Sequence, residues 1–231
     1  MIDLHCHSKF SDGTLSPQEL INKAESIGLE ILALTDHDTV DGVESFLNLN
    51  SAVKRIPGVE ISIDYNEGTF HLVGLFIDHT NSTLSDTLTL LKDYRRERNN
   101  KIMKKLSELL QKDIKIEDIS IDKYGELGRP HIARFLVKEG VASSIEDAFV
   151  KYLGKGKILY TDKKRLSLDE SIQLIKKAGG ITILAHPITL SENDRFNPTF
   201  FNKLKENGLD GIEVFCSLHD ESISKKYLEI A

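Results

Sequence analysis

Short apolar runs alternate with amphipathic segments along much of this chain. Residues 2–7 (IDLHCH) and 29–38 (LEILALTDHD) each combine an apolar run with a polar end, which predicts two strands. Between them, Pro17 follows a serine and opens an amphipathic segment that reaches Gly28, so we expect a capped helix that stops at this glycine. The N-terminal part of the chain therefore predicts a strand, a helix and a second strand.

The same order of elements returns twice in the C-terminal half of the chain. Residues 167–187 (SLDESIQLIKKAGGITILAHP) and 200–216 (FFNKLKENGLDGIEVFC) each predict a helix, a glycine stop and an apolar strand. Repeated helix–strand units favour an α/β fold, with a parallel sheet or barrel covered by helices. Folds of this kind carry their functional groups at the carboxyl ends of the strands.

Ionisable residues gather beside the ends of the predicted strands. They are His5, His7, Asp36, His37, Glu60, His71, His186 and Glu213, with Asp12 in a Ser-Asp-Gly turn. Because side chains alternate along a strand, His5 and His7 are expected on one face and Cys6 on the other. Any single one of these residues is more often a hydrogen-bonded core residue or a helix cap than a metal ligand. Their joint occurrence at strand ends from distant segments instead favours a multinuclear metal site.

Composition and charge narrow the class of protein. With 231 residues, 40% hydrophobic and 29% charged, the composition is that of an ordinary globular protein. A net charge of -6 argues against a surface built to bind duplex DNA, although it is compatible with a local basic pocket. No apolar run approaches the roughly 20 residues of a membrane span, and the N-terminus carries no export signal. We therefore expect a cytoplasmic protein without a membrane partner, in which Cys6 and Cys216 are free thiols.

Basic residues concentrate in one stretch, residues 94–105 (YRRERNNKIMKK), which is rich in helix-forming residues. Taken alone, this stretch is best explained as the solvated face of an amphipathic helix. Arg95 and Arg98 are three residues apart and therefore share one face of that helix. A guanidinium group matches the geometry of a phosphate, so a phosphate-binding face is the alternative.

Six segments together resemble the polymerase and histidinol phosphatase (PHP) superfamily. They extend over nearly the whole chain and read DLHCHSKFSDGT, LALTDHD, IPGVEIS, FHLVGLFID, GRPHIARFLV and AGGITILAHP. Within the superfamily, GRPHIARFL, AFVKYLGKGK and AGGITILAHP are similar to the branch of phosphoesterases that act on nucleoside 3',5'-bisphosphates and on short RNA from the 5' end. The resemblance implies a distorted seven-stranded β/α barrel made of residues 1–81 and 158–231, with residues 82–157 as an inserted helical subdomain.

The same resemblance implies a cluster of three divalent metal ions, usually manganese, iron or zinc. The implied ligands are His5, His7 and Glu60 for the first ion, Glu60, His71 and His186 for the second, and Asp12 and His37 for the third. Glu60 and His37 would take part in catalysis, in which metal-bound water attacks phosphorus. No serine or cysteine nucleophile is needed for this chemistry, and no Gly-x-Ser-x-Gly motif is present. The implied substrate contacts come from Arg95, Arg98, Arg129 and His131.

One motif of the family is missing from this sequence. The family completes its metal cluster with Asp-x-His on a late strand, whereas this chain stops at SKKYLEIA, within a predicted helix. We therefore expect either a metal-dependent phosphoesterase whose C-terminal part is absent, or a non-catalytic metal-binding or regulatory module of the same fold. The codons after Ala231 in the gene distinguish these two hypotheses. A nucleic-acid-binding protein without catalysis is a weaker third hypothesis, because the negative net charge of the chain gives it little support. The oligomeric state stays open.

Overall fold

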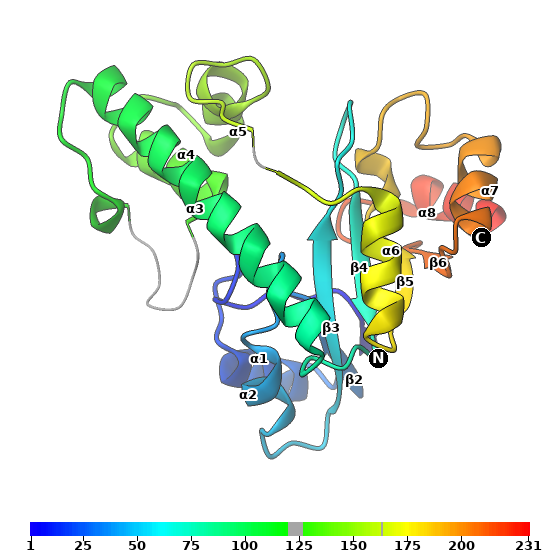
Figure 1. Cartoon of the computed structure of the whole chain (residues 1–231). Helices are drawn as coiled ribbons and strands as arrows, with labels where there is room; N and C mark the ends of the chain where they lie inside the picture. The colour runs from blue at the N-terminus through cyan, green and yellow to red at the C-terminus, as the bar shows by residue number, and fades with distance from the viewer. Residues whose placement is uncertain (120–126, 163) are drawn as a thin grey trace.

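The computed structural model describes residues 1–119, 127–162 and 164–231 (Figure 1). Its strands are β1 (Ile2–Asp3), β2 (Ile31–Leu34), β3 (Lys54–Ser62), β4 (His71–Leu75), β5 (Ile181–Leu184) and β6 (Gly211–Ile212). Its helices are α1 (Pro17–Ser26), α2 (Val43–Leu47), α3 (Ser82–Leu110), α4 (Arg129–Lys138), α5 (Ile145–Ala148), α6 (Leu168–Lys177), α7 (Pro198–Glu206) and α8 (Glu221–Ile230). Shorter helical segments are η1 (Ile116–Asp118), η2 (Phe149–Leu153) and η3 (Pro187–Thr189).

The strands form one sheet in the order β1-β2-β3-β4-β5-β6. Neighbouring strands are parallel except at β4, which is antiparallel to both β3 and β5. The prediction of a parallel sheet is therefore wrong at this strand. Only the short segment 63–70 joins β3 to β4, whereas a parallel pair needs a crossover of about a dozen residues or more. As a result, the first residue of β4, His71, pairs with Ser62 at the carboxyl end of β3.

The predicted α/β class is confirmed, with six strands in the described residues where the family resemblance implied seven. The sheet is curled into a half-barrel (Figure 1). Shortly after β1, Nδ1 of His5 lies 3.2 Å from Oε1 of Glu213, the residue that follows β6. The two outer strands of the half-barrel are therefore connected through side chains.

Local sequence signals explain where the predicted helices begin and end. The Glu19 amide donates to the Ser16 hydroxyl, and the Ser16 amide donates to the Glu19 carboxylate, which caps α1. Ser167 and Glu170 form the same capping box at α6. Gly28 follows α1 with a φ of 73°, a conformation that favours glycine. The predicted order of helix, glycine and strand is confirmed in these units.

Helix α3 connects two hydrophobic cores. Leu84 and Leu88, near its N-terminus, belong to the main cluster that packs on the sheet. Ile102 and Leu106, further along the helix, belong to a second cluster that includes Ile132 of α4. The basic turns of α3 therefore lie between the two cores. Neither α3 nor any other helix in the described part of the chain is both long and apolar enough to cross a membrane.

Candidate metal centre and substrate pocket

His5 and His7 lie just beyond the first strand. β1 ends at Asp3 and not at residue 7 as predicted, yet the backbone stays beside β2. The Thr35 amide donates to the Cys6 carbonyl at 2.9 Å, and the Cys6 amide donates to the Thr35 hydroxyl at 3.1 Å. Cys6 packs against the core under β2, whereas the rings of His5 and His7 lie together with their centroids 5.2 Å apart. The predicted alternation therefore continues past the end of the regular strand.

Glu60 lies at the centre of the site, near the end of β3, and its side chain has no exposed surface. Five histidine nitrogens surround its carboxylate. The nitrogens near Oε2 are Nε2 of His5 at 3.2 Å, Nε2 of His7 at 2.9 Å and Nδ1 of His37 at 3.0 Å; those near Oε1 are Nδ1 of His71 at 2.8 Å and Nε2 of His186 at 2.9 Å. Asp12 joins the group because its Oδ1 lies 2.8 Å from Nδ1 of His7. The structure thus brings together all seven residues that the family resemblance implied as ligands.

The pairing of the strands explains why these residues meet. His37 lies beside Glu60 in an isolated parallel bridge just beyond β2. His71 begins β4 at the same edge of the sheet, and its carbonyl accepts a hydrogen bond from the Ala185 amide at 3.1 Å. This bond places His186, the next residue, beside His71. Four neighbouring strands therefore direct their ligand candidates to one end of the half-barrel.

The contacts around Glu60 fit bound metal ions better than a set of hydrogen bonds. Oε2 of Glu60 and Nδ1 of His37 are both buried and make no hydrogen bond, although they lie 3.0 Å apart. Nε2 of His5 and Nε2 of His7 lie 3.2 Å apart, and only one of them can donate a proton to the other. Nitrogen and carboxylate donors that converge in this way suit Mn²⁺, Fe²⁺ and Zn²⁺. Three groups have suitable spacing, with ligand atoms within 4.8 Å of one another: His5, His7 and Glu60; His7, Asp12 and His37; and His37, Glu60 and His71.

Burial and charge act in opposite directions on the protonation of this cluster. Burial alone would raise the carboxyl pKa of Glu60, but the rings of His37 and His71 hold that pKa well below its usual range. Burial lowers the pKa of His71 to about 4, so this ring is neutral near pH 7 and offers a lone pair. Burial also opposes the proton on His5, yet the nearby carboxylates of Glu213 and Glu60 raise its pKa to about 9. At His5 the two carboxylates therefore outweigh the effect of burial.

Asp36 is buried beside the cluster and was not implied as a ligand. Its Oδ1 accepts hydrogen bonds from the Ser8 amide at 2.7 Å and the Ser11 hydroxyl at 2.6 Å, and its Oδ2 accepts one from the Ser8 hydroxyl at 2.7 Å. These bonds hold the loop that carries Asp12 against the segment that carries His37. Asp36 therefore positions two ligand candidates.

Asp36→Ala is expected to lower the free energy of unfolding by about 2–4 kcal/mol, because the buried Ser8 amide loses its acceptor. Asp36→Asn is the matched control, since its amide oxygen can replace Oδ1 and the Ser8 hydroxyl can turn to accept from its NH2 group. We expect a loss of less than ~1.5 kcal/mol for that variant. Urea denaturation of the metal-free protein measures both values. A loss in Asp36→Ala as small as the one expected for Asp36→Asn would show that these hydrogen bonds do not stabilise the loop.

Arg95 of α3 is tied to the end of the sheet. Its guanidinium group pairs with the carboxylate of Asp38, which also accepts a hydrogen bond from the Ser62 amide at 3.1 Å. Asp38 is buried and has a φ of 52°, in the left-handed region. The ion pair therefore holds α3 beside the segment that carries His37, and it already neutralises part of the charge of Arg95.

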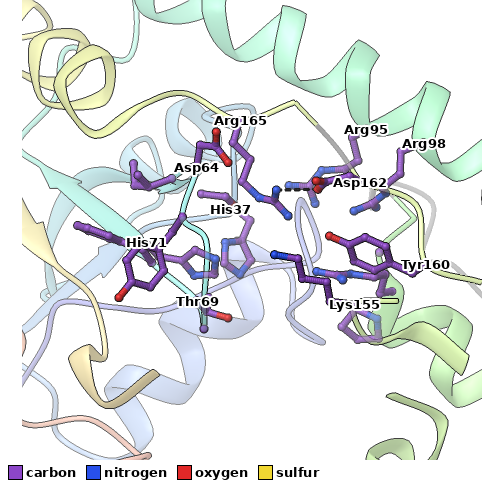
Figure 2. Close-up of a pocket in the computed structure, with 18 of the residues that line it drawn as sticks. His37, Asp64, Thr69, His71, Arg95, Arg98, Lys155, Tyr160, Asp162 and Arg165 are labelled. Atoms are coloured by element: carbon purple, nitrogen blue, oxygen red, sulfur yellow. Dashed lines mark hydrogen bonds and ion pairs between the residues drawn. The ribbon is translucent and has the colours of Figure 1, made fainter. Parts of the chain in front are cut away.

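A cavity of about 830 Å³ lies beside the cluster (Figure 2). Three ligand candidates, Asp12, His37 and His71, form part of its wall. The cavity is also lined by three of the four predicted substrate-binding residues, Arg95, Arg98 and Arg129, and by three residues that sequence reasoning missed, Lys155, Tyr160 and Arg165. Cationic side chains and the candidate metal ligands therefore share one cavity.

Arg98 is buried, which is unusual for an arginine. Its Nε and Nη2 donate to Oδ1 of Asn99 at 3.1 and 2.7 Å, and the Asn99 amide group donates to a backbone carbonyl. Burial, together with the charges of Arg95, Arg129 and Arg165, lowers the pKa of Arg98 to about 9. Several guanidinium groups so close together would be stabilised by an anion in the cavity.

His131 is placed differently from the three predicted arginines. Its Nδ1 accepts a hydrogen bond from the Gly128 amide at 2.9 Å, at the N-terminus of α4. The ring is buried, and His131 is not among the described residues that line the cavity. The hydrogen bond favours a role in capping α4, and its contact with substrate stays a prediction.

The missed cavity residues come from segments that are distant from α3 in the sequence. Nζ of Lys155 donates to the Asn66 carbonyl at 2.8 Å, which links the segment after η2 to the β3–β4 connection. Nη1 of Arg165 donates to Asp162 at 2.8 Å (Figure 2). The basic run KKR just before α6 was the available signal for Arg165. Lys155 lies in AFVKYLGKGK, one of the segments similar to the phosphoesterase branch, whereas no comparable signal marks Tyr160.

Two known proteins of similar sequence have names that describe enzymes acting on RNA or on a nucleoside bisphosphate. The chain is 35% identical over 214 residues to a 5'-3' exoribonuclease of Haemophilus influenzae, and the match covers 92% of this chain and 78% of the relative. It is 32% identical over 232 residues to a 3',5'-nucleoside bisphosphate phosphatase of Chromobacterium violaceum, with 94% of this chain and 78% of the relative covered.

Structural and family comparisons agree with these relatives. A crystal structure from Bifidobacterium adolescentis, described as a metal-dependent phosphoesterase, superposes with a TM-score of 0.83 at 27% identity. The superposition covers 100% of this chain and 82% of the other. Residues 3–178 match the PHP domain, which is most of the chain. This chain therefore belongs to the PHP domain family.

Proposed function

We propose that this protein is a metal-dependent phosphoesterase that hydrolyses a phosphomonoester of a nucleoside 3',5'-bisphosphate or processes short RNA from the 5' end. One observation carries the proposal: a buried carboxylate surrounded by histidines lies beside a cavity that is also lined by arginines. Two relatives support it, because each is named for one of these activities. The non-catalytic alternative is not favoured, since both relatives match more than 90% of this chain and are named as enzymes.

The proposed cofactors are three divalent metal ions, with manganese, iron and zinc as the candidates. His5, His7 and Glu60 would hold the first, Glu60, His71 and His186 the second, and Asp12 and His37 the third. Bound ions of this kind supply positive charge to phosphate oxygens and lower the pKa of water. The catalytic roles proposed for Glu60 and His37 agree with their positions, because Glu60 contacts most of the ligand candidates and His37 lines the cavity.

The arginines of the cavity would bind a second phosphate of the same substrate. With the scissile phosphate at the wall formed by Asp12, His37 and His71, the uncleaved phosphate would meet Arg98 and Arg129. A guanidinium group can donate two parallel hydrogen bonds to a phosphate, which fixes its orientation. The proposed substrate therefore carries two phosphates separated by a sugar, as both a nucleoside bisphosphate and an RNA 5' end do.

The domain organisation stays a proposal, with residues 1–81 and 158–231 as the barrel and residues 82–157 as an inserted helical subdomain. Support comes from the second hydrophobic cluster, which draws its buried residues from α3, α4 and the segments that follow. Residues 120–126 of the proposed insertion lie outside the described residues. A seventh strand, a cytoplasmic location and small phosphorylated partners in place of duplex DNA belong to the same proposal.

Removing divalent metal ions is expected to abolish hydrolysis of a nucleoside 3',5'-bisphosphate, because the proposed activation of water needs a bound ion. The protein is dialysed against a chelator and assayed for released inorganic phosphate. It is then assayed again after Mn²⁺, Fe²⁺ or Zn²⁺ is restored, one ion at a time. We expect at least one ion to restore activity. Unchanged phosphate release from protein that elemental analysis finds free of metal would contradict the proposed function.

A further inference from the structure

We infer that Glu213 is a positioning residue that orients the His5 ring and the His186 backbone together. The inference rests on the proposed metal centre and concerns a residue outside its ligand set, beyond residues 3–178 that match the PHP domain. Glu213 follows β6, and its amide donates to the carbonyl of Leu184, the last residue of β5, at 2.9 Å. This bond holds Glu213 at the end of the half-barrel where the ligand candidates meet.

The carboxylate of Glu213 uses both of its oxygens. Oε1 lies 3.2 Å from Nδ1 of His5, and Oε2 accepts a hydrogen bond from the His186 amide at 2.6 Å. His186 has a φ of 28°, a conformation that residues with a side chain adopt rarely and that neighbouring contacts must stabilise. In this conformation Nε2 of His186 lies 2.9 Å from Glu60. Glu213 therefore supports the backbone that directs this ring into the centre.

The contact with His5 decides which ring nitrogen carries the proton and which one offers a lone pair to the centre. A carboxylate only accepts hydrogen bonds, so Glu213 favours a proton on Nδ1 of His5. Nε2 of His5, which lies 3.2 Å from both Glu60 and Nε2 of His7, then offers its lone pair to a metal ion. Histidine ligands commonly donate their second N–H group to a carboxylate in this way. Glu213 has the chemistry and the position of such a partner.

Glutamine at position 213 tests this inference without changing the shape of the side chain. The amide oxygen would accept from the His186 amide, which directs the NH2 group at Nδ1 of His5. Nδ1 of His5 must then accept a hydrogen bond from this NH2 group. The proton of the neutral ring therefore moves to Nε2, the nitrogen at which a metal ion would bind. Glu213→Gln is therefore expected to weaken the binding of Mn²⁺ and of Zn²⁺, each titrated alone, by roughly 10–100-fold.

Metal affinity is measured by competition with a chromophoric chelator. Glu206→Gln is the matched control, because Glu206 is an exposed residue of α7 and its replacement removes the same charge. We expect wild-type affinity for this control. Wild-type affinity in Glu213→Gln would overturn the inference. If the wild-type protein binds neither ion, the proposed metal centre fails, and the role of Glu213 is decided on the metal-free protein.

Amide hydrogen exchange of the metal-free protein provides that second measurement. Glu213→Ala is expected to lose protection at the His186 amide by roughly 10-fold or more, because a hydrogen bond to a charged acceptor is removed. Glu213→Gln keeps an acceptor at this position and should keep most of the protection. Wild-type protection of His186 in Glu213→Ala would show that Glu213 does not position this backbone.

Discussion

Glu60→Gln is expected to reduce the phosphoesterase activity on the order of a thousandfold or more and to release bound metal. The Glu60 carboxylate is in contact with histidine nitrogens from five different positions, so it would supply negative charge to more than one ion. Glutamine is neutral, and its NH2 group would place a donor where ring lone pairs converge. A loss of about 4 kcal/mol of transition-state stabilisation corresponds to this change in rate.

The measurement is kcat/KM for a nucleoside 3',5'-bisphosphate, together with metal content by elemental analysis. Glu206→Gln again serves as the control for a lost carboxylate at an exposed position. Circular dichroism establishes that both variants are folded. A variant at position 60 with full metal content and a near-normal rate would rule out a bridging role for this carboxylate.

Arg98→Ala is expected to weaken the binding of a nucleoside 3',5'-bisphosphate by roughly tenfold to a hundredfold, without a change in metal content. The expected loss is that of a charge-assisted hydrogen bond to the uncleaved phosphate, about 1.5–3 kcal/mol. Arg98 is held in place by Asn99 and lies among other arginines, so its charge is already directed at the cavity. A phosphomonoester without a second phosphate should be hydrolysed almost as well as by the wild type.

Two further variants separate substrate binding from a structural effect of the buried side chain. Arg96→Ala removes an exposed arginine from the same helix and should leave both substrates unaffected. Arg98→Lys keeps the charge but loses the forked geometry, so we expect an intermediate affinity for the bisphosphate. The affinities come from substrate competition, and stability comes from thermal unfolding. Equal losses for both substrates would show that Arg98 does not bind the second phosphate.

His131→Ala should weaken the binding of the bisphosphate less than Arg98→Ala does, since the His131 ring caps α4.

The sequence was most informative where contacts are local. Strand alternation separated His5 and His7 from Cys6, and the capping residues located the start of α1. Ligand chemistry at predicted strand ends selected residues that the fold then brought together around Glu60. Alternation and capping depend on residues a few positions apart, and side-chain periodicity records that spacing directly. The ligand set also depended on the family resemblance.

Strand direction and strand number were harder to predict. In a fully parallel sheet, His71 would lie at the start of its strand and far from the end of β3. It reaches Glu60 because β4 is antiparallel, which the short connection from β3 requires. β1 was predicted too long because the residues after Asp3 stay beside β2 but do not pair with it regularly. The pattern of apolar residues along the sequence shows neither the direction of a strand nor where its regular pairing ends.

The sequence by itself singled out the histidines and carboxylates that lie around Glu60 and three of the arginines that line the cavity, and it located the starts of α1 and α6. Only the tertiary structure decided which of these side chains are neighbours. Arg95 meets Asp38 across 57 positions, and Glu213 meets His5 across 208 positions. Such contacts depend on how the whole chain closes its loops and packs its two cores, whereas the sequence pattern repeats over only a few residues. The ligand candidates were therefore visible in the sequence, while the contacts by which Asp36 and Glu213 position them became visible only in the fold.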